Sequence, residues 1–310
     1  RMEPVLVALK TVLPLFLVFF AGTVFSKIKG SSELWVDILN KYALWIGFPA
    51  LIIASLMQLE TGEKSYINLI LLNSAYIVGS VLLAFPLARL FNFSSRMKRT
   101  LFLILPFGNV AYLGIPVLNN AFGSGILPVA AIISAVYVFW LLTLSLILVE
   151  VYGQSTINMK KLVMRLIQNP LLIAVFLGLI IVSFDLEIPL VMQKTIHLFS
   201  DSVTAVVLFS LGIFLGMQQF GNLHNWIKVT LWSLVTMVAL PVLFFGLLSF
   251  SSLPPLQLKA TILDATMPLG LTPYALSIQY ELETTLVARM VVLGTVISLV
   301  LIPIWIVFLG

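Results

Sequence analysis

The sequence contains no cysteine, only two histidines and few charged side chains. Without cysteine there is neither a disulfide framework nor a thiolate metal site, and redox chemistry gives no indication of the compartment. Charged residues make up 9% of the 310 residues, whereas 61% are hydrophobic. Soluble domains carry about 25% charged residues. The composition therefore predicts a membrane protein, and the mean hydropathy of +1.14 agrees.

Apolar stretches fill nearly the whole chain. A membrane-spanning helix needs about 20 apolar residues. We count ten such stretches, near residues 4–26, 34–57, 65–90, 97–122, 125–152, 162–184, 189–218, 222–250, 257–280 and 284–309. The longest polar connection, Tyr152–Lys161, is too short for a soluble domain. We therefore predict an all-α polytopic membrane protein with ten transmembrane helices.

The positive charges are unevenly divided between the connections. Twelve fall at odd-numbered connections: Lys27, Lys29, Lys41, Arg89, Arg96, Lys98, Arg99, Lys160, Lys161, Arg165, Lys228 and Arg289. Five fall on the other side: Arg1, Lys10, Lys64, Lys194 and Lys259. The positive-inside rule then predicts cytoplasmic odd connections and both termini outside. The basic residues behind the net charge of +5 thus set the orientation in the membrane, and those at Arg96–Arg99 also contact anionic lipid headgroups. No nucleic-acid partner is therefore expected.

The two halves of the sequence resemble each other. The run PLFLVFFAG at Pro14–Gly22 matches PLLIAVFLG at Pro170–Gly178 at a shift of 156, and Pro116 and Pro273 are 157 apart. Each half holds five predicted spans, an odd number, so the second half enters the membrane in the opposite orientation. We therefore predict two inverted five-helix repeats joined by a cytoplasmic linker. Their bounds are 1–152 and 162–310, with the linker at 153–161.

The fourth and ninth stretches are interrupted by proline, glycine and small polar residues. They read LPFGNVAYLGIPVLNN at Leu105–Asn120 and ATMPLGLTPYALSIQ at Ala265–Gln279. Proline removes a backbone donor, and unpaired backbone in a bilayer is tolerated only against protein or a wet cavity. Two broken, crossing helices at matching positions predict a transporter's binding site, although prolines are also common in membrane helices. The predicted substrate-binding residues are Asn109, Tyr112, Gly114, Pro116, Thr266, Pro268, Gly270 and Pro273.

Two aspartates fall well inside predicted spans. Asp201 lies in the run FSDSVTAVVLFSLG, and Asp264 directly precedes the interruption of the ninth stretch. Charges at such depth are costly and usually functional. Both are therefore candidates for binding a coupling ion, H⁺ or Na⁺. The alternative is an aspartate that holds helices together through hydrogen bonds. We predict no other cofactor and assign no metal site with certainty.

Four runs resemble the auxin efflux carrier family of permeases. GNVAYLGIP at Gly108–Pro116 is similar to the fourth-span signature of that family, and DSVTAVVLFSLG at Asp201–Gly212 to its seventh-span motif. MPLGLTPYALSIQY at Met267–Tyr280 and VVLGTVISLVLIP at Val291–Pro303 resemble its C-terminal end. The resemblance covers nearly the whole chain.

The resemblance implies a fold akin to the bile-acid sodium symporters, with a scaffold domain and a transport domain. It also implies organic anions as substrates: auxin in plant members and dicarboxylates such as malonate in some bacterial ones. Asn109 falls where the plant carriers have their crossover asparagine. Two features depart from the family. The long cytoplasmic loop of many plant carriers is absent, which favours a prokaryotic protein, and Asp264 stands where a small residue is expected.

The predicted function is a secondary active transporter, not an enzyme, that moves a small organic anion such as a carboxylate by alternating access. No nucleotide-binding P-loop is present to drive a pump. The alternatives are a sodium-coupled bile-acid-type symporter, a passive channel, and an intramembrane aspartyl protease that pairs Asp201 with Asp264. The predicted location is the bacterial inner membrane, as a multi-pass protein. The expected partners are the substrate and the bilayer, with a homodimer left open.

Overall fold

A computed structural model describes residues 3–28, 33–57, 66–153, 167–217, 226–248 and 252–309, together with 160, 163 and 164. For residues 3–12 it describes the backbone alone. Most of the predicted linker 153–161 lies outside the described residues. Several of the basic residues used to predict the topology also lie outside the described residues, or have side chains that are not described: Arg1, Lys10, Lys29, Lys64, Lys161 and Arg165.

The first half of the chain forms helices that are interrupted or widened at several places. They are α1 (Glu3–Phe25), α2 (Glu33–Tyr42), α3 (Phe48–Leu56), α4 (Ile67–Leu90), α5 (Ser95–Ile104), α6 (Ile115–Phe122), α7 (Leu127–Trp140) and α8 (Leu146–Val151). Three π-helical turns connect neighbouring helices or begin one: Ala43–Gly47, Val110–Gly114 and Leu141–Ser145. A short 3₁₀ turn, Ser124–Ile126, precedes α7.

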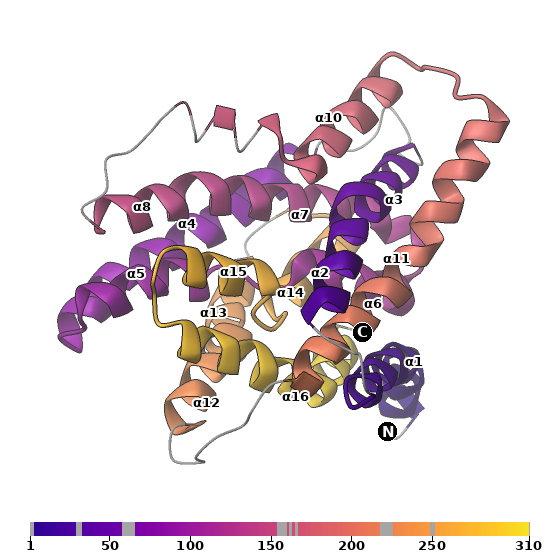
Figure 1. Ribbon diagram of the computed structural model, residues 1–310. Coiled ribbons are helices and arrows are strands. Elements are labelled where there is room, and N and C mark those ends of the chain that lie inside the picture. Colours follow the sequence, from indigo (N-terminus) through magenta and orange to yellow (C-terminus); the bar gives the residue numbers. More distant parts are fainter. Residues whose placement is uncertain are drawn as a thin grey trace.

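The second half follows a similar order of elements. Its helices are α10 (Pro170–Ser183), α11 (Leu190–Met217), α12 (Trp226–Leu234), α13 (Leu240–Leu248), α14 (Pro255–Ala265), α15 (Leu271–Gln279) and α16 (Thr284–Leu309). A fourth π-helical turn, Val235–Ala239, joins α12 to α13. Figure 1 shows α14 and α15 in the middle of the bundle, with α1 and α16 packed side by side.

The all-helical membrane fold class is confirmed. Among the described residues, six helical segments are long and apolar enough to cross a membrane: Glu33–Leu56, Ile67–Leu90, Ser124–Val151, Leu190–Met217, Trp226–Leu248 and Thr284–Leu309. Shorter apolar helices lie at Leu13–Phe25, Val110–Phe122 and Pro170–Ser183. No β-strand occurs among the described residues, which contain a single isolated β-bridge.

Two glycines allow α1 and α11 to pack backbone against backbone. A β-carbon at Gly22 would overlap the carbonyl oxygen of Phe209, and one at Gly212 would overlap the carbonyl oxygen of Phe19. Lipid is as apolar as a leucine side chain, so membrane helices associate mainly through such close packing. The α1–α11 contact therefore depends on the absence of side chains at these two positions.

Polar side chains in α1 and directly after it reinforce this contact. The Thr23 hydroxyl donates a hydrogen bond to the carbonyl oxygen of Gly212 at 3.1 Å. The Lys27 ammonium donates to the carbonyl oxygen of Gly216 at 2.6 Å. Gly216 lies in the last turn of α11, where carbonyl groups lack intrahelical partners and the helix dipole attracts a cation. Lys27 thus donates a hydrogen bond to a carbonyl group at the C-terminus of α11 that has no donor within its own helix.

The arginines of the predicted lipid-facing cluster bind protein carbonyl groups. Arg99 donates to the carbonyl oxygens of Val149, at the end of α8, and Tyr280, at the end of α15, at 2.9 and 3.2 Å. Arg96 donates to Leu282 O at 2.7 Å. These carbonyl groups lie at or just beyond helix C-termini, where no intrahelical donor remains. The cluster therefore holds the ends of α8 and α15 together in addition to its predicted role in topology.

Replacing Gly212 by alanine should destabilise the protein. The methyl group has no space against α1, and overpacking of this kind costs about 1–3 kcal/mol. The matched control is Gly79→Ala in α4, where no atom lies within 4 Å of the added carbon and helix propensity favours alanine. We expect a lower thermal unfolding midpoint in detergent for Gly212→Ala only. Equal midpoints for the two variants would show that α1 and α11 do not pack as described.

Candidate functional site

Both predicted interruptions exist, but they lie earlier in each stretch than the prolines Pro116 and Pro273. The first covers residues 105–109, between α5 and the π-helical turn at Val110, and the second covers 266–270, between α14 and α15. Pro273 is in the first turn of α15, where a missing N–H costs nothing. Pro116 lies within α6 directly after the π-helical turn. The interruptions themselves contain Pro106 and Pro268, whereas Pro116 and Pro273 lie within the helices that follow.

The two interruptions pair with each other through their backbones. Gly108 and Leu269 form an antiparallel β-bridge, and the N–H of Asn109 donates to the carbonyl oxygen of Pro268 at 2.6 Å. A β-carbon at Gly108 would lie 2.7 Å from the carbonyl oxygen of Met267, so glycine is required for this approach. We call residues 105–109 and 266–270 the crossover. Hydrogen bonds between its two segments of backbone thus pair some of the N–H and C=O groups that the helix interruptions leave without partners.

A cavity of about 150 Å³ adjoins the crossover. Four predicted substrate-binding residues line it: Asn109, Tyr112, Gly270 and Pro273. Its lining also includes Tyr137 of α7, Thr272 of α15 and Asn169, the residue before α10. The cavity therefore draws on segments from both halves of the chain. We refer to it below as the crossover cavity.

Two helix N-termini open onto the crossover cavity. Val110, Ala111 and Tyr112 begin the helical segment after the first interruption, and Leu271 and Thr272 begin α15 after the second. Neither N-terminus has a side-chain cap. The first N–H groups of a helix have no intrahelical acceptor, and together they carry a partial positive charge. This arrangement suits an anionic group.

Three of the four π-helical turns in the described part of the chain contribute to the crossover cavity. Leu44 belongs to the first, Val110–Tyr112 to the second, and Leu141 and Leu142 to the third. A π-helical turn inserts an extra residue into a helix, and such turns occur frequently at functional sites. Their clustering here is a feature that the sequence analysis did not identify.

Asn109 carries a free donor beside this cavity. The residue is 5% exposed, and its side-chain Nδ2 has no partner among the described residues. Its backbone is already engaged, since the N–H bonds to Pro268 and the carbonyl oxygen accepts from Leu113 and Gly114. A buried amide without an acceptor is costly unless a ligand or water supplies one. The Asn109 side chain is therefore available to a bound anion.

Asp264 lies behind the crossover, completely buried. Neither carboxylate oxygen has a hydrogen-bond partner among the described residues. A β-carbon at Gly114 would overlap Asp264 Oδ1, so the carboxyl group packs against the glycine of the second π-helical turn. The buried Tyr137 hydroxyl likewise has no partner among the described residues. An isolated charge is strongly disfavoured there, so the group requires a proton or a cation.

The remaining predicted substrate-binding residues lie outside the lining of the crossover cavity. Gly114 faces Asp264, and Pro116 is buried in α6. The Thr266 hydroxyl donates to the carbonyl oxygen of Leu263 at 2.7 Å. Pro268 accepts the Asn109 N–H. These four residues shape or support the crossover and do not border the cavity.

Asp201 lies near the middle of α11, and its side chain is exposed on that helix. The buried face of this part of α11 carries Ser200, Val203 and Val207, spaced by three and four residues. At 100° per residue Asp201 points away from that face. The structure thus separates the two candidate carboxylates, one exposed and one completely buried.

Three polar cavity-lining residues were missed from the sequence: Tyr137, Asn169 and Thr272. Asn169 precedes Pro170, and its Oδ1 accepts the N–H groups of Leu171 and Leu172 at 3.0 and 3.2 Å. Asparagine before proline is a recognisable helix N-cap signal but carries no hint of a cavity. Tyr137 stands in an uninterrupted apolar run, where nothing distinguishes it from a packing residue.

Comparison with known proteins identifies the family. The family profile described as "membrane transport protein" matches residues 7–306. The chain belongs to this family. Such a family implies a transporter and not an enzyme, and the apolar helices agree with a multi-pass membrane protein.

The relatives of this membrane transport protein include archaeal and plant members. It is 25% identical to an uncharacterized transporter of Methanothermobacter thermautotrophicus, with 96% of each chain aligned. It is also 25% identical to an uncharacterized transporter of Methanocaldococcus jannaschii over 91% of this chain and 92% of that one. It is 28% identical to auxin efflux carrier component 6 of Arabidopsis thaliana over 50% of this chain, which spans only 29% of the plant protein.

Adding a methyl group at Gly114 should disturb Asp264. Because that group would overlap Oδ1, we expect Gly114→Ala to reduce the free energy of unfolding by about 1–3 kcal/mol. The thermal unfolding midpoint should fall accordingly. Gly125→Ala is the control, since no atom lies within 4 Å of a carbon added there. In a double-mutant cycle Asp264→Ala should relieve part of the Gly114→Ala effect. Strictly additive effects of the two substitutions would mean that the residues do not touch.

Proposed function

We propose that this membrane transport protein is a secondary transporter that moves a small organic anion, such as a carboxylate, by alternating access. The observation that carries the proposal is the crossover cavity, where two uncapped helix N-termini and the free Asn109 amide surround one space. Half-helix N-termini directed at an anionic group are a recurring feature of transporters with broken helices. Family membership supports the transport function itself.

The charge and size of the crossover cavity favour a small anion. No Asp, Glu, Lys or Arg is among its lining residues in the described part of the chain. An anion would therefore meet only neutral donors and helix dipoles, which attract it without the strong ion pair that slows release. The volume of about 150 Å³ is below the roughly 300–1,000 Å³ typical of drug-sized ligands. A compact carboxylate of a few carbons fits this description.

The proposed architecture is two inverted five-helix repeats, 1–152 and 162–310, with the linker 153–161 between them. The similar order of elements in the two halves supports it, since each contains one helix pair separated by an interruption of five residues, 105–109 and 266–270. The proposed topology has ten spans, cytoplasmic odd connections and both termini outside. We propose location in the bacterial inner membrane, as a multi-pass protein.

A ligand screen tests the proposed substrate class. The purified protein is heated with a panel of mono- and dicarboxylates, each with and without sodium and at two pH values. A bound ligand raises the unfolding midpoint by mass action. We expect small carboxylates to stabilise the protein and neutral amides of the same size to leave it unchanged. Saturable, trans-stimulated flux in liposomes then distinguishes a carrier from a passive channel. Stabilisation by neutral compounds alone would contradict the proposal.

The second part of the proposal is that Asp264 is the residue that couples transport to H⁺ or Na⁺. Its carboxyl group is completely buried without a described partner, and it packs against the π-helical turn that begins at the crossover. A proton or a sodium ion bound to Asp264 neutralises its charge. The crossover then packs differently from the way it packs around the unprotonated, ion-free carboxylate. Asp201 was the other candidate, and its exposure on α11 makes it the weaker one.

The Asn109 amide should bind the substrate carboxylate directly. Asn109→Ala removes the free donor, so we expect affinity to fall by about 1–3 kcal/mol while the unfolding midpoint without ligand stays close to wild type. Asn119→Ala is the matched control, since Asn119 lies on α6 outside the lining of the crossover cavity. Isothermal titration or transport competition measures the difference. Unchanged affinity in a folded Asn109→Ala protein would show that the Asn109 amide does not bind the substrate carboxylate.

Asp264 should control the dependence of transport on pH or sodium. Asp264→Asn keeps the shape of a protonated carboxyl group but cannot release a proton or ligate a cation with charge. We expect the pH dependence of net transport to flatten, or the sodium dependence to vanish, while exchange of substrate for substrate survives. Asp201→Asn should leave both dependences as they are. If Asp201→Asn alone removes the dependence, coupling belongs to Asp201.

A further inference from the structure

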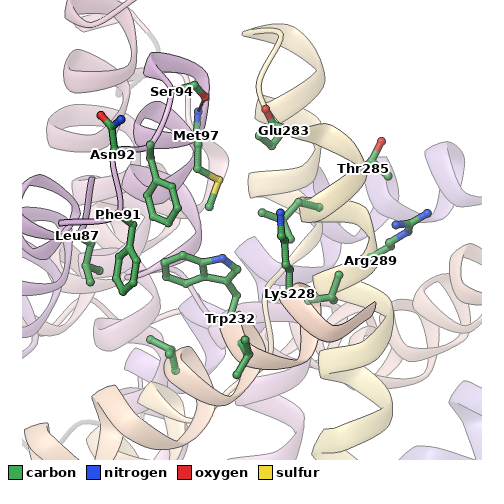
Figure 2. A pocket seen from close by; sticks show the side chains of 15 residues that line it. Leu87, Phe91, Asn92, Ser94, Met97, Lys228, Trp232, Glu283, Thr285 and Arg289 are labelled. Atoms are coloured by element: carbon green, nitrogen blue, oxygen red, sulfur yellow. Dashed lines mark hydrogen bonds between the residues drawn. The ribbon is translucent and has the colours of Figure 1, made fainter. Parts of the chain in front are cut away.

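A large cavity lies away from the crossover, at the end of the bundle where α4 ends and α5 begins. Its volume is about 840 Å³, and α12 and the first turns of α16 form its other walls. Figure 2 shows the Lys228 side chain rising from α12, with Trp232 on one side and Arg289 on the other. None of the residues that line the crossover cavity takes part in it.

The cavity continues into an apolar groove. A second space of about 830 Å³ shares Leu87 and Val235 with it and runs between α4 and α13. Apart from Arg89, the groove is lined by apolar residues: Leu83, Pro86, Leu87, Leu90, Val235, Ala239, Leu240 and Leu243. The two spaces together form one elongated site, with a polar end at α12 and α16 and an apolar end along α4.

The polar end is predominantly cationic. Lys228 and Arg289 line it, and the Arg289 guanidinium lies 5.6 Å from the centre of the Trp226 ring. Glu283 is the one carboxylate among its described lining residues, and its charge is offset by Arg96, whose Nε lies 3.6 Å from Oε1. Phe91, Phe93 and Trp232 supply apolar walls directly beside these cations.

We propose that this site binds an anionic phospholipid of the surrounding membrane, with its phosphate at Lys228 and Arg289 and an acyl chain in the groove along α4. A cationic end joined to a long apolar groove matches an amphiphile with a negative headgroup. The site lies at the end of the bundle that carries most of the predicted cytoplasmic cations, where anionic lipids attract basic residues. A free phosphate ion would use only the cationic end and leave the apolar groove unfilled.

The bound lipid connects parts of the two halves of the chain. Its headgroup lies between the α4–α5 turn of the first half and α12 and α16 of the second. The α4–α5 turn is continuous with the helix that leads to the first interruption, and α16 packs against α14 and α15. The lipid therefore stabilises the arrangement of the helices that carry the crossover.

Retention of lipid by the purified protein tests the proposal. The protein is exchanged into mixed micelles of phosphatidylglycerol and phosphatidylcholine, and native mass spectrometry counts the lipids that stay bound. We expect the wild type to prefer phosphatidylglycerol and Lys228→Gln to weaken that preference about five-fold, as the contribution of one cation near an anionic lipid implies. Lys41→Gln is the matched control, because Lys41 is an exposed lysine on the same predicted side but outside this cavity.

A second readout follows the acyl chain. Phosphatidylglycerol with a brominated acyl chain should quench part of the tryptophan fluorescence, and Trp232→Phe should remove that part. Equal retention of both lipids by the wild type, or equal effects of Lys228→Gln and Lys41→Gln, would overturn the proposal. Displacement of bound lipid by millimolar inorganic phosphate would instead assign the cationic end to free phosphate. None of these outcomes depends on transport, so the proposed function stands or fails separately.

Discussion

The structure depends on one constraint, that backbone N–H and C=O groups cannot stay unpaired inside a membrane protein. Both halves of the chain contain an interruption that frees such groups, and each interruption satisfies the other through the Gly108–Leu269 bridge and the Asn109–Pro268 hydrogen bond. Neither interruption could persist alone in an apolar environment. The same rule governs the helix ends at the periphery, where Lys27, Arg96 and Arg99 bind carbonyl groups of neighbouring segments.

The pairing of the interruptions has an electrostatic consequence. Each one ends where a new helical segment begins, so two N-termini with unsatisfied donors are held beside one cavity. The proposed anion site therefore needs no buried lysine or arginine, which would need compensation of its own. Asp264 lies on the other side of the second π-helical turn, in contact with Gly114. In the proposed function, occupancy of the crossover cavity and neutralisation of Asp264 would therefore act on the same short segment of backbone.

The periphery of the bundle serves different physical requirements. The α1–α11 contact is a backbone packing arrangement made possible by glycines, and it needs no cavity or charge. At the end of the bundle that carries Lys228 and Arg289, by contrast, the helices leave space that protein atoms do not fill. A soluble protein would collapse such a space or fill it with water. The phospholipid that we propose to bind there would supply both an apolar chain and a charged headgroup.

The sequence by itself determined the membrane class, the family and the presence of an interruption in each half, because hydropathy and the positions of proline and glycine act locally. Four of the residues it predicted, Asn109, Tyr112, Gly270 and Pro273, line the crossover cavity. Only the tertiary structure decided that the helices break before Pro116 and Pro273, that Asp264 is buried while Asp201 is exposed, and that Tyr137, Asn169 and Thr272 join the cavity. The physical reason is that membrane helices are apolar on the lipid side and on the protein side alike. Periodicity therefore does not reveal which face is buried, and that depends on which helices become neighbours.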